Sequence, residues 1–153
     1  MSSIEEILAR DGRLIYTIKG ISMLPMLHQM RDVVAIFVPD GPLQKYDVAL
    51  YKRGKQYVLH RVIRVKDNYY LIRGDNTYAM ETVPKENVIG ILKAFTRKGK
   101  SHTVQDIDYK CYVRFWCAIY PIRLFYKKCR WRLGRIARKL GIRRPVVSDK
   151  KNK

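Results

Sequence analysis

Short β-prone runs separated by turn residues fill most of the first two thirds of this chain, and they constrain the fold more than any other feature. The runs cover residues 14–18, 32–38, 47–51, 57–65, 69–73 and 88–95. A serine cap followed by Glu5 and Glu6 also predicts one brief helix over Ile4–Leu8. Short strands at close spacing are typical of compact β domains. The sequence therefore predicts a mostly-β domain over residues 1–105 that begins with a short helix.

The charge of the chain is divided unevenly along its 153 residues. Residues 1–109 carry 17 Lys and Arg against 12 Asp and Glu, whereas residues 110–153 carry 15 against 1. The overall net charge of +19 therefore belongs mainly to the C-terminal part. We expect residues 106–144 to form a basic, aromatic, amphipathic helical tail and residues 145–153 to be disordered.

Three segments of the predicted domain carry residues suited to peptide hydrolysis. Ser22 follows Gly20 and precedes Pro25 in a bend, His60 lies inside the run 57–65, and Gly74-Asp75-Asn76 follows the run 69–73. A serine hydroxyl becomes a useful nucleophile only when a base takes its proton, and a base on a strand is held rigidly. Taken singly, Ser22 could be a turn residue and His60 a hydrogen-bonded strand histidine.

His60 is the histidine predicted to lie in the middle of a strand. His28 falls in the loop after Pro25, and His102 falls at the edge of the domain. A third group usually orients such a base. Asp75 is one candidate for this role, with an Asx turn as its other interpretation, and Glu81 in the same loop is the second.

In this order, the serine, His-Arg-Val and Gly-Asp-Asn segments resemble the motif boxes of the signal peptidase I superfamily, which includes the self-cleaving SOS-type repressors. The resemblance spans about residues 18–92 and is closest to the branch in which a histidine replaces the general-base lysine. It implies a signal-peptidase-like fold, Ser22 as nucleophile and His60 as general base. It also implies an oxyanion site at the backbone N–H of Ser22 with help near Gly20, an extended peptide substrate, and neither metal nor cofactor.

The chain departs from the family pattern at three places. Met26 stands where the family usually has threonine, and Met30-Arg31-Asp32 replaces a Gly-Asp pair one residue later than usual. Met80-Glu81 stands where the eukaryotic-type enzymes have the acidic pair that supplies the triad acid. The resemblance therefore leaves both Asp75 and Glu81 open as the third member.

Signal peptidases carry a membrane-spanning segment before the serine box, and residues 1–21 contain neither such a segment nor a signal peptide. We therefore expect the tail to act as a peripheral anchor on an anionic membrane surface. The candidate anchor residues are Phe115, Trp116, Phe125 and Trp131. The other interpretations are a helix packed on the domain or on a partner, and a tail that binds nucleic acid. The three cysteines, Cys111, Cys117 and Cys129, are expected to be reduced thiols.

These features together predict a serine endopeptidase of signal-peptidase type that cleaves a peptide or preprotein near a membrane surface. Its expected location is the cytoplasm or the cytoplasmic face of a membrane. The alternative is a non-catalytic peptide-binding or regulatory domain of the same fold, whose basic tail binds nucleic acid. The sequence does not indicate an oligomeric state.

Overall fold

A computed structural model describes residues 4–139 of the chain. The chain divides into two compact units between Trp116 and Cys117. The first unit contains helix α1 (Ile4–Asp11), all the strands and most of helix α2 (Ile107–Ala118), and the second contains helix α3 (Tyr120–Lys139). The site discussed below lies entirely within the first unit.

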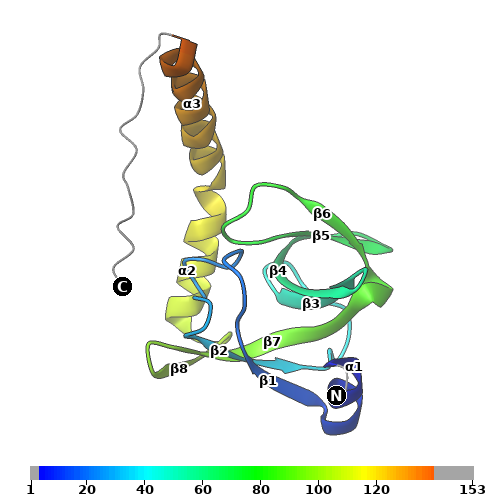
Figure 1. The fold of residues 1–153 in the computed structure, drawn as a ribbon. Helices are drawn as coiled ribbons and strands as arrows, with labels where there is room; N and C mark the ends of the chain where they lie inside the picture. The colour runs from blue at the N-terminus through cyan, green and yellow to red at the C-terminus, as the bar shows by residue number, and fades with distance from the viewer. Residues whose placement is uncertain (1–3, 140–153) are drawn as a thin grey trace, which may run out of the picture. The chain divides into compact units, whose positions relative to one another are not determined.

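One antiparallel sheet of eight strands makes up most of the first unit, and it curls into a half-barrel (Figure 1). The strands are β1 (Arg13–Thr17), β2 (Val33–Phe37), β3 (Val48–Arg53), β4 (Gln56–Val65), β5 (Tyr69–Arg73), β6 (Glu81–Pro84), β7 (Val88–Arg97) and β8 (Lys100–Thr103). Their order is β1-β2-β7-β3-β4-β5-β6, with β8 paired to β7. Strands β1 and β6 therefore form the two ends of the main strand order, and a 3-10 turn (Lys85–Asn87) connects β6 to β7. The mostly-β prediction and the short N-terminal helix are confirmed.

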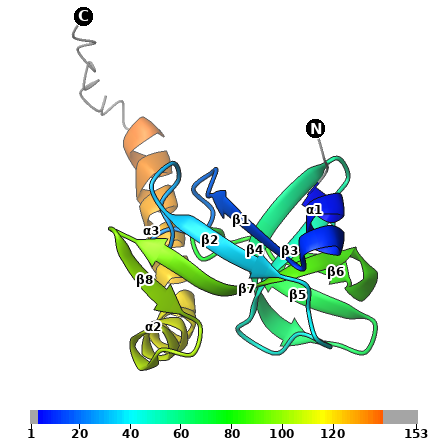
Figure 2. The same ribbon diagram turned by 90° about the horizontal axis from the view of Figure 1, so that it is seen from below.

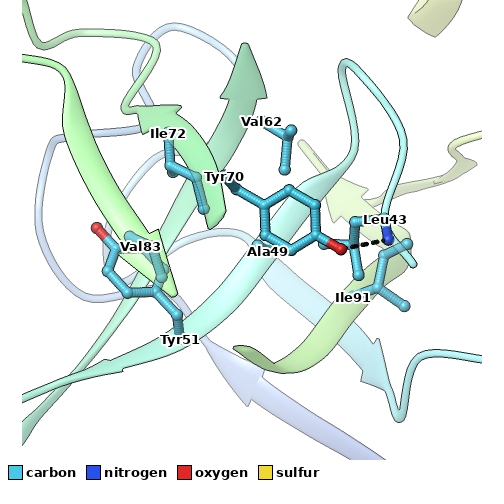
Figure 3. Packing of buried hydrophobic residues seen from close by; sticks show 8 residues of the cluster. All are labelled: Leu43, Ala49, Tyr51, Val62, Tyr70, Ile72, Val83 and Ile91. Atoms are coloured by element: carbon cyan, nitrogen blue, oxygen red, sulfur yellow. Dashed lines mark hydrogen bonds between the residues drawn. The ribbon is translucent and has the colours of Figure 1, made fainter. Parts of the chain in front are cut away.

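Runs of buried apolar residues hold these strands together, and in β3 four consecutive residues, Val48 to Tyr51, are buried. A central cluster of buried side chains comprises Leu43, Ala49, Tyr51, Val62, Tyr70, Ile72, Val83 and Ile91 (Figure 3). The hydroxyl of Tyr70 accepts a hydrogen bond of 2.8 Å from the backbone N–H of Leu43, which satisfies this buried polar group. The cluster draws on β3, β4, β5, β6 and β7, so it fixes the strands on which the candidate site is built.

Within the first unit, Tyr109 and Val113 of α2 are both buried, and the ring of Tyr109 lies 5.7 Å from that of Phe95 on β7. The compact unit consequently extends to Trp116, whereas the sequence suggested a boundary near residue 105. The helical region is also divided, because α2 ends at Ala118 and α3 begins at Tyr120. Pro121 is the second residue of α3, where a missing N–H is tolerated, and this favours the start of a new helix there.

Two strands were not predicted, and one of them changes an argument made from the sequence. Strand β6 lies in a region predicted to be a loop, and β8 pairs with β7 (Figure 2). Strand β8 spans Lys100–Thr103 and so contains His102. His102 therefore also lies in a strand, and its position does not distinguish it from His60. What distinguishes His60 as the candidate base is the set of groups around its ring, which is described below.

Candidate active site

Ser22 lies in a tight turn that follows β1, and buried apolar side chains of the same turn hold it in place. Met23, Met26 and Leu27 are buried, while Ser22 itself is half-buried. Gly20 precedes the turn with a φ of 88°, a value that favours glycine. Its backbone N–H donates a 3.2 Å hydrogen bond to the side chain of Gln29. Buried neighbours thus hold the turn in place and leave the serine at the surface.

The Gly-Asp-Asn segment holds this turn through Asn76. The backbone N–H of Asn76 donates to the carbonyl oxygen of Ser22 at 2.8 Å, and its side-chain amide donates to the carbonyl of Ile21 at 3.2 Å. The loop after β5 and the turn after β1 are therefore linked at the serine itself, although more than fifty residues separate them in the sequence.

Gly74 lies close to both Ser22 and His60. A Cβ atom added to Gly74 would lie 2.7 Å from the carbonyl oxygen of Ser22 and 3.0 Å from Nε2 of His60. The backbone of Ser22 and the Nε2 edge of the imidazole therefore both lie next to this glycine. Within the described part of the chain, the hydroxyl and backbone N–H of Ser22 make no hydrogen bond to the protein. Catalytic hydrogen bonds in substrate-free enzymes are often longer than in the complex, so the hydroxyl is available to move toward Nε2.

We expect Gly74→Ala to separate the two groups, because the new methyl group cannot occupy the space that backbone and imidazole now fill. A displacement near 1 Å at a reacting pair lowers activity by about 100-fold. Gly41→Ala is the matched control, since a Cβ there meets nothing within 4 Å. Comparing peptide cleavage by the two variants checks this, and equal activities would contradict the assigned contact.

The Nδ1 edge of His60 faces a chain of polar groups from β3 and β6. The hydroxyl of Tyr51 lies 3.1 Å from Nδ1 of His60 and donates to Oε2 of Glu81 at 2.8 Å. Oε1 of Glu81 lies 3.6 Å from the same nitrogen and accepts a 3.0 Å hydrogen bond from Arg53. Strand pairing explains the arrangement, because small Ala49 stands opposite His60 and leaves room for Tyr51 to reach the ring.

This arrangement determines which ring nitrogen of His60 carries the proton. An ionised carboxylate only accepts hydrogen bonds, so the single hydroxyl proton of Tyr51 is directed to Glu81. Burial, together with the adjacent Glu81, raises the pKa of Tyr51, so the hydroxyl keeps that proton. The oxygen of Tyr51 then accepts from Nδ1–H of His60. In this tautomer Nε2 is unprotonated and lies on the side of Ser22, as a general base requires.

Burial is the largest influence on the pKa of His60 and lowers it below the ordinary value. Glu81 opposes this effect, Arg53 adds to it, and Asp75 opposes it more weakly. The imidazole is therefore neutral, and able to accept a proton, at neutral pH.

Asp75 is engaged elsewhere, in a buried ion pair with Arg61. The guanidinium donates two hydrogen bonds to the carboxylate, from Nε at 2.8 Å and from Nη2 at 2.7 Å. Burial opposes the charge of Arg61, yet Asp75 and Tyr109 hold its pKa above the ordinary value. Arg61 also donates to the hydroxyl of Tyr109 and to the sulfur of Met26. This pair thus joins β4, the Gly-Asp-Asn loop, the serine turn and α2.

Of the residues predicted from the sequence, the structure brings Ser22 and His60 to the same glycine and places Glu81 beside Nδ1 of His60. Asp75 pairs instead with Arg61. Sequence reasoning did not identify Tyr51, Arg53 or Arg61 as parts of the site. Arg61 is the middle residue of the His-Arg-Val box, and this position in the box could have indicated that it belongs to the site.

The four predicted anchor residues have different surroundings. Trp116 is half-buried, and its indole N–H donates a 3.0 Å hydrogen bond to the carbonyl of Asp75. Phe115, Phe125 and Trp131 are exposed. Trp116 therefore covers the Gly-Asp-Asn loop, and its contacts are those of a structural residue.

His102, Asp106 and Asp108 form a second group of polar side chains, and their possible ligand atoms lie within 4.8 Å of one another. The carboxylate of Asp106 accepts from both the backbone N–H and the hydroxyl of Thr103, at 2.8 and 2.5 Å. These bonds close the turn between β8 and α2, and we assign no ion to the group.

No family model matches the sequence, and no curated protein gives a significant match to it. The functional argument therefore depends on the geometry of Ser22, His60 and their neighbours, and on the resemblance of the three motif boxes.

Proposed function

We propose that this protein is a serine endopeptidase of signal-peptidase type. The observation that carries the proposal is the convergence of Ser22 and Nε2 of His60 on Gly74, with Tyr51 and Glu81 at the opposite edge of the imidazole. A solvent-accessible serine, a neutral buried histidine and a carboxylate behind it are the three groups that nucleophilic hydrolysis needs.

In the proposed reaction, Nε2 of His60 takes the proton of the Ser22 hydroxyl as the oxygen attacks the scissile carbonyl carbon. The imidazolium then gives this proton to the leaving amine, and the C–N bond breaks to leave an acyl group on Ser22. Water attacks the ester with His60 again as base, which releases the acid product and restores the serine. The unpaired backbone N–H of Ser22 is the proposed donor to the oxyanion.

Tyr51 and Glu81 are the proposed positioning residues of the imidazole. Glu81 holds the hydroxyl of Tyr51, and that hydroxyl holds His60 in the required tautomer. The carboxylate of Glu81 and the oxygen of Tyr51 also stabilise the imidazolium that forms during each proton transfer. Asp75 has a structural role in this scheme, because both of its oxygens bind Arg61.

The substrate proposed for this site is an extended peptide that adds to a strand edge. Strands β1 and β6 end the strand order, and the serine turn follows β1 while Glu81 begins β6. Backbone groups at either edge can pair with a peptide, which supplies affinity with little dependence on sequence. Ile21 and Met80 are exposed beside the catalytic groups and could contact substrate side chains. Incubation of the protein with a mixed-sequence peptide pool, with new termini read by mass spectrometry, tests for cleavage.

The pH dependence of cleavage gives a prediction specific to these residues. Since burial lowers the pKa of His60, the rise of kcat/KM with pH should have its midpoint below 6.5. Glu81 favours the charged imidazole, so Glu81→Gln should move this midpoint to lower pH. Arg53 disfavours it, so Arg53→Gln should move the midpoint to higher pH. If both variants moved the midpoint in the same direction, or if neither moved it, the assignment of Glu81 and Arg53 to the surroundings of His60 would be contradicted.

A further inference from the structure

Helix α3 carries a stripe of exposed apolar side chains. Ile122, Phe125 and Tyr126 stand at positions i, i+3 and i+4, so they share one face of the helix. Their exposed fractions are 68%, 70% and 66%. Large apolar side chains gathered at one place on a surface indicate an interaction site more often than isolated ones do. We call these three residues the apolar stripe.

The charge of the same helix selects the kind of partner. Of the 20 residues of α3, eight are basic and none is acidic. The basic residues are Arg123, Lys127, Lys128, Arg130, Arg132, Arg135, Arg138 and Lys139. A surface complementary to this helix is therefore negatively charged and can also receive apolar groups, and a membrane containing anionic lipids has both properties.

The length and polarity of α3, and the side of the helix on which each residue lies, agree with binding in the plane of such a membrane. Among the described helices, none is long and apolar enough to cross a bilayer. Trp131 lies nine residues after Ile122, about two and a half turns of helix, and so falls on the side opposite the stripe. There its ring packs under the guanidinium of Arg135 at 3.7 Å. The predicted anchor residue Trp131 thus has a partner on its own helix, whereas the stripe is left to contact lipid.

We propose that α3 docks on anionic membranes with the apolar stripe in the acyl boundary and the basic side chains at the headgroups. Nucleic acid is the competing partner for a basic helix. It does not account for Ile122, Phe125 and Tyr126 together, because the aliphatic side chain of Ile122 offers neither charge to phosphates nor a ring for base stacking. The apolar stripe, more than the positive charge, therefore favours an anionic membrane over nucleic acid as the partner.

Co-sedimentation of the full chain with vesicles tests this proposal independently of any peptidase activity. The vesicles contain either phosphatidylcholine alone or phosphatidylcholine mixed with phosphatidylserine. We expect binding to the mixed vesicles only, and Phe125→Ser should weaken it by roughly tenfold or more, as loss of one buried aromatic side chain predicts. Ile15→Ser is the matched control, because Ile15 is 61% exposed on β1 and outside the stripe. This variant should bind as the unchanged protein does.

Phe125→Leu keeps an apolar side chain and should retain binding, which separates loss of contact from loss of helix. Equal binding to both vesicle types, no binding to either, or equal binding by Phe125→Ser and the unchanged protein would each overturn the proposal. Retention of duplex DNA without vesicle binding would assign the helix to nucleic acid instead.

Discussion

Ser22→Ala and His60→Ala should each lower the rate of peptide cleavage by about 10⁴-fold or more, with the β fold retained. In serine peptidases the nucleophile and base act as a unit, so loss of either removes most of the rate enhancement. The double variant should for the same reason be no slower than the slower single variant. Appearance of new peptide termini over time is the measurement, with near-ultraviolet circular dichroism to verify the fold.

The control for this result is His102→Ala, because His102 also lies in a strand but its ring stacks on Phe95. Its cleavage rate should stay close to that of the unchanged protein. Cleavage that persists in Ser22→Ala would assign the activity to another group and contradict the proposed function.

Asp75→Ala should cost about 3–5 kcal/mol in the free energy of unfolding, because it leaves the fully buried guanidinium of Arg61 without its carboxylate. Glu81→Gln should change this free energy by no more than about 1 kcal/mol, since Glu81 is only partly buried and its ion pair with Arg53 is exposed. Its effect should fall on catalysis instead, as a loss of roughly 100-fold in kcat. Urea denaturation and cleavage kinetics separate the two roles.

The double variant Asp75→Ala, Arg61→Met is the matched control for this comparison. It removes both charges, so no buried charge is left unpaired, and it should be more stable than Asp75→Ala alone. If Glu81→Gln were the destabilised variant and Asp75→Ala the stable but inactive one, the roles assigned to these two carboxylates would be reversed.

The sequence predicted the six longer strands because each carries a run of β-branched, aromatic or aliphatic residues between turn residues. Strands β6 and β8 escaped prediction for a local reason. Strand β6 contains a single buried residue, Val83, and β8 is a polar strand of Lys-Ser-His-Thr paired only to β7. Their strand conformation comes from pairing with the preceding strands, β6 with β5 and β8 with β7, which the residues of these short segments do not indicate by themselves.

Ser22, His60 and the two candidate carboxylates could be named from the sequence because residue type and order of the boxes carry that information. The roles of Asp75 and Glu81 could not be separated, since they depend on which side chains meet across the sheet. Tyr51 illustrates the same limit. It reaches His60 only because β3 and β4 pair with Ala49 opposite the histidine, and strand register is a property of the folded sheet.

The account depends most directly on Ser22 being a nucleophile activated by His60, and labelling by a fluorophosphonate measures this without knowledge of the substrate. The reagent phosphonylates an activated serine, and mass spectrometry of the digested protein identifies the modified residue. We predict an adduct on Ser22 in the unchanged protein and its loss in His60→Ala. A folded protein that gives no adduct on Ser22, or the same extent of labelling without His60, would contradict the account.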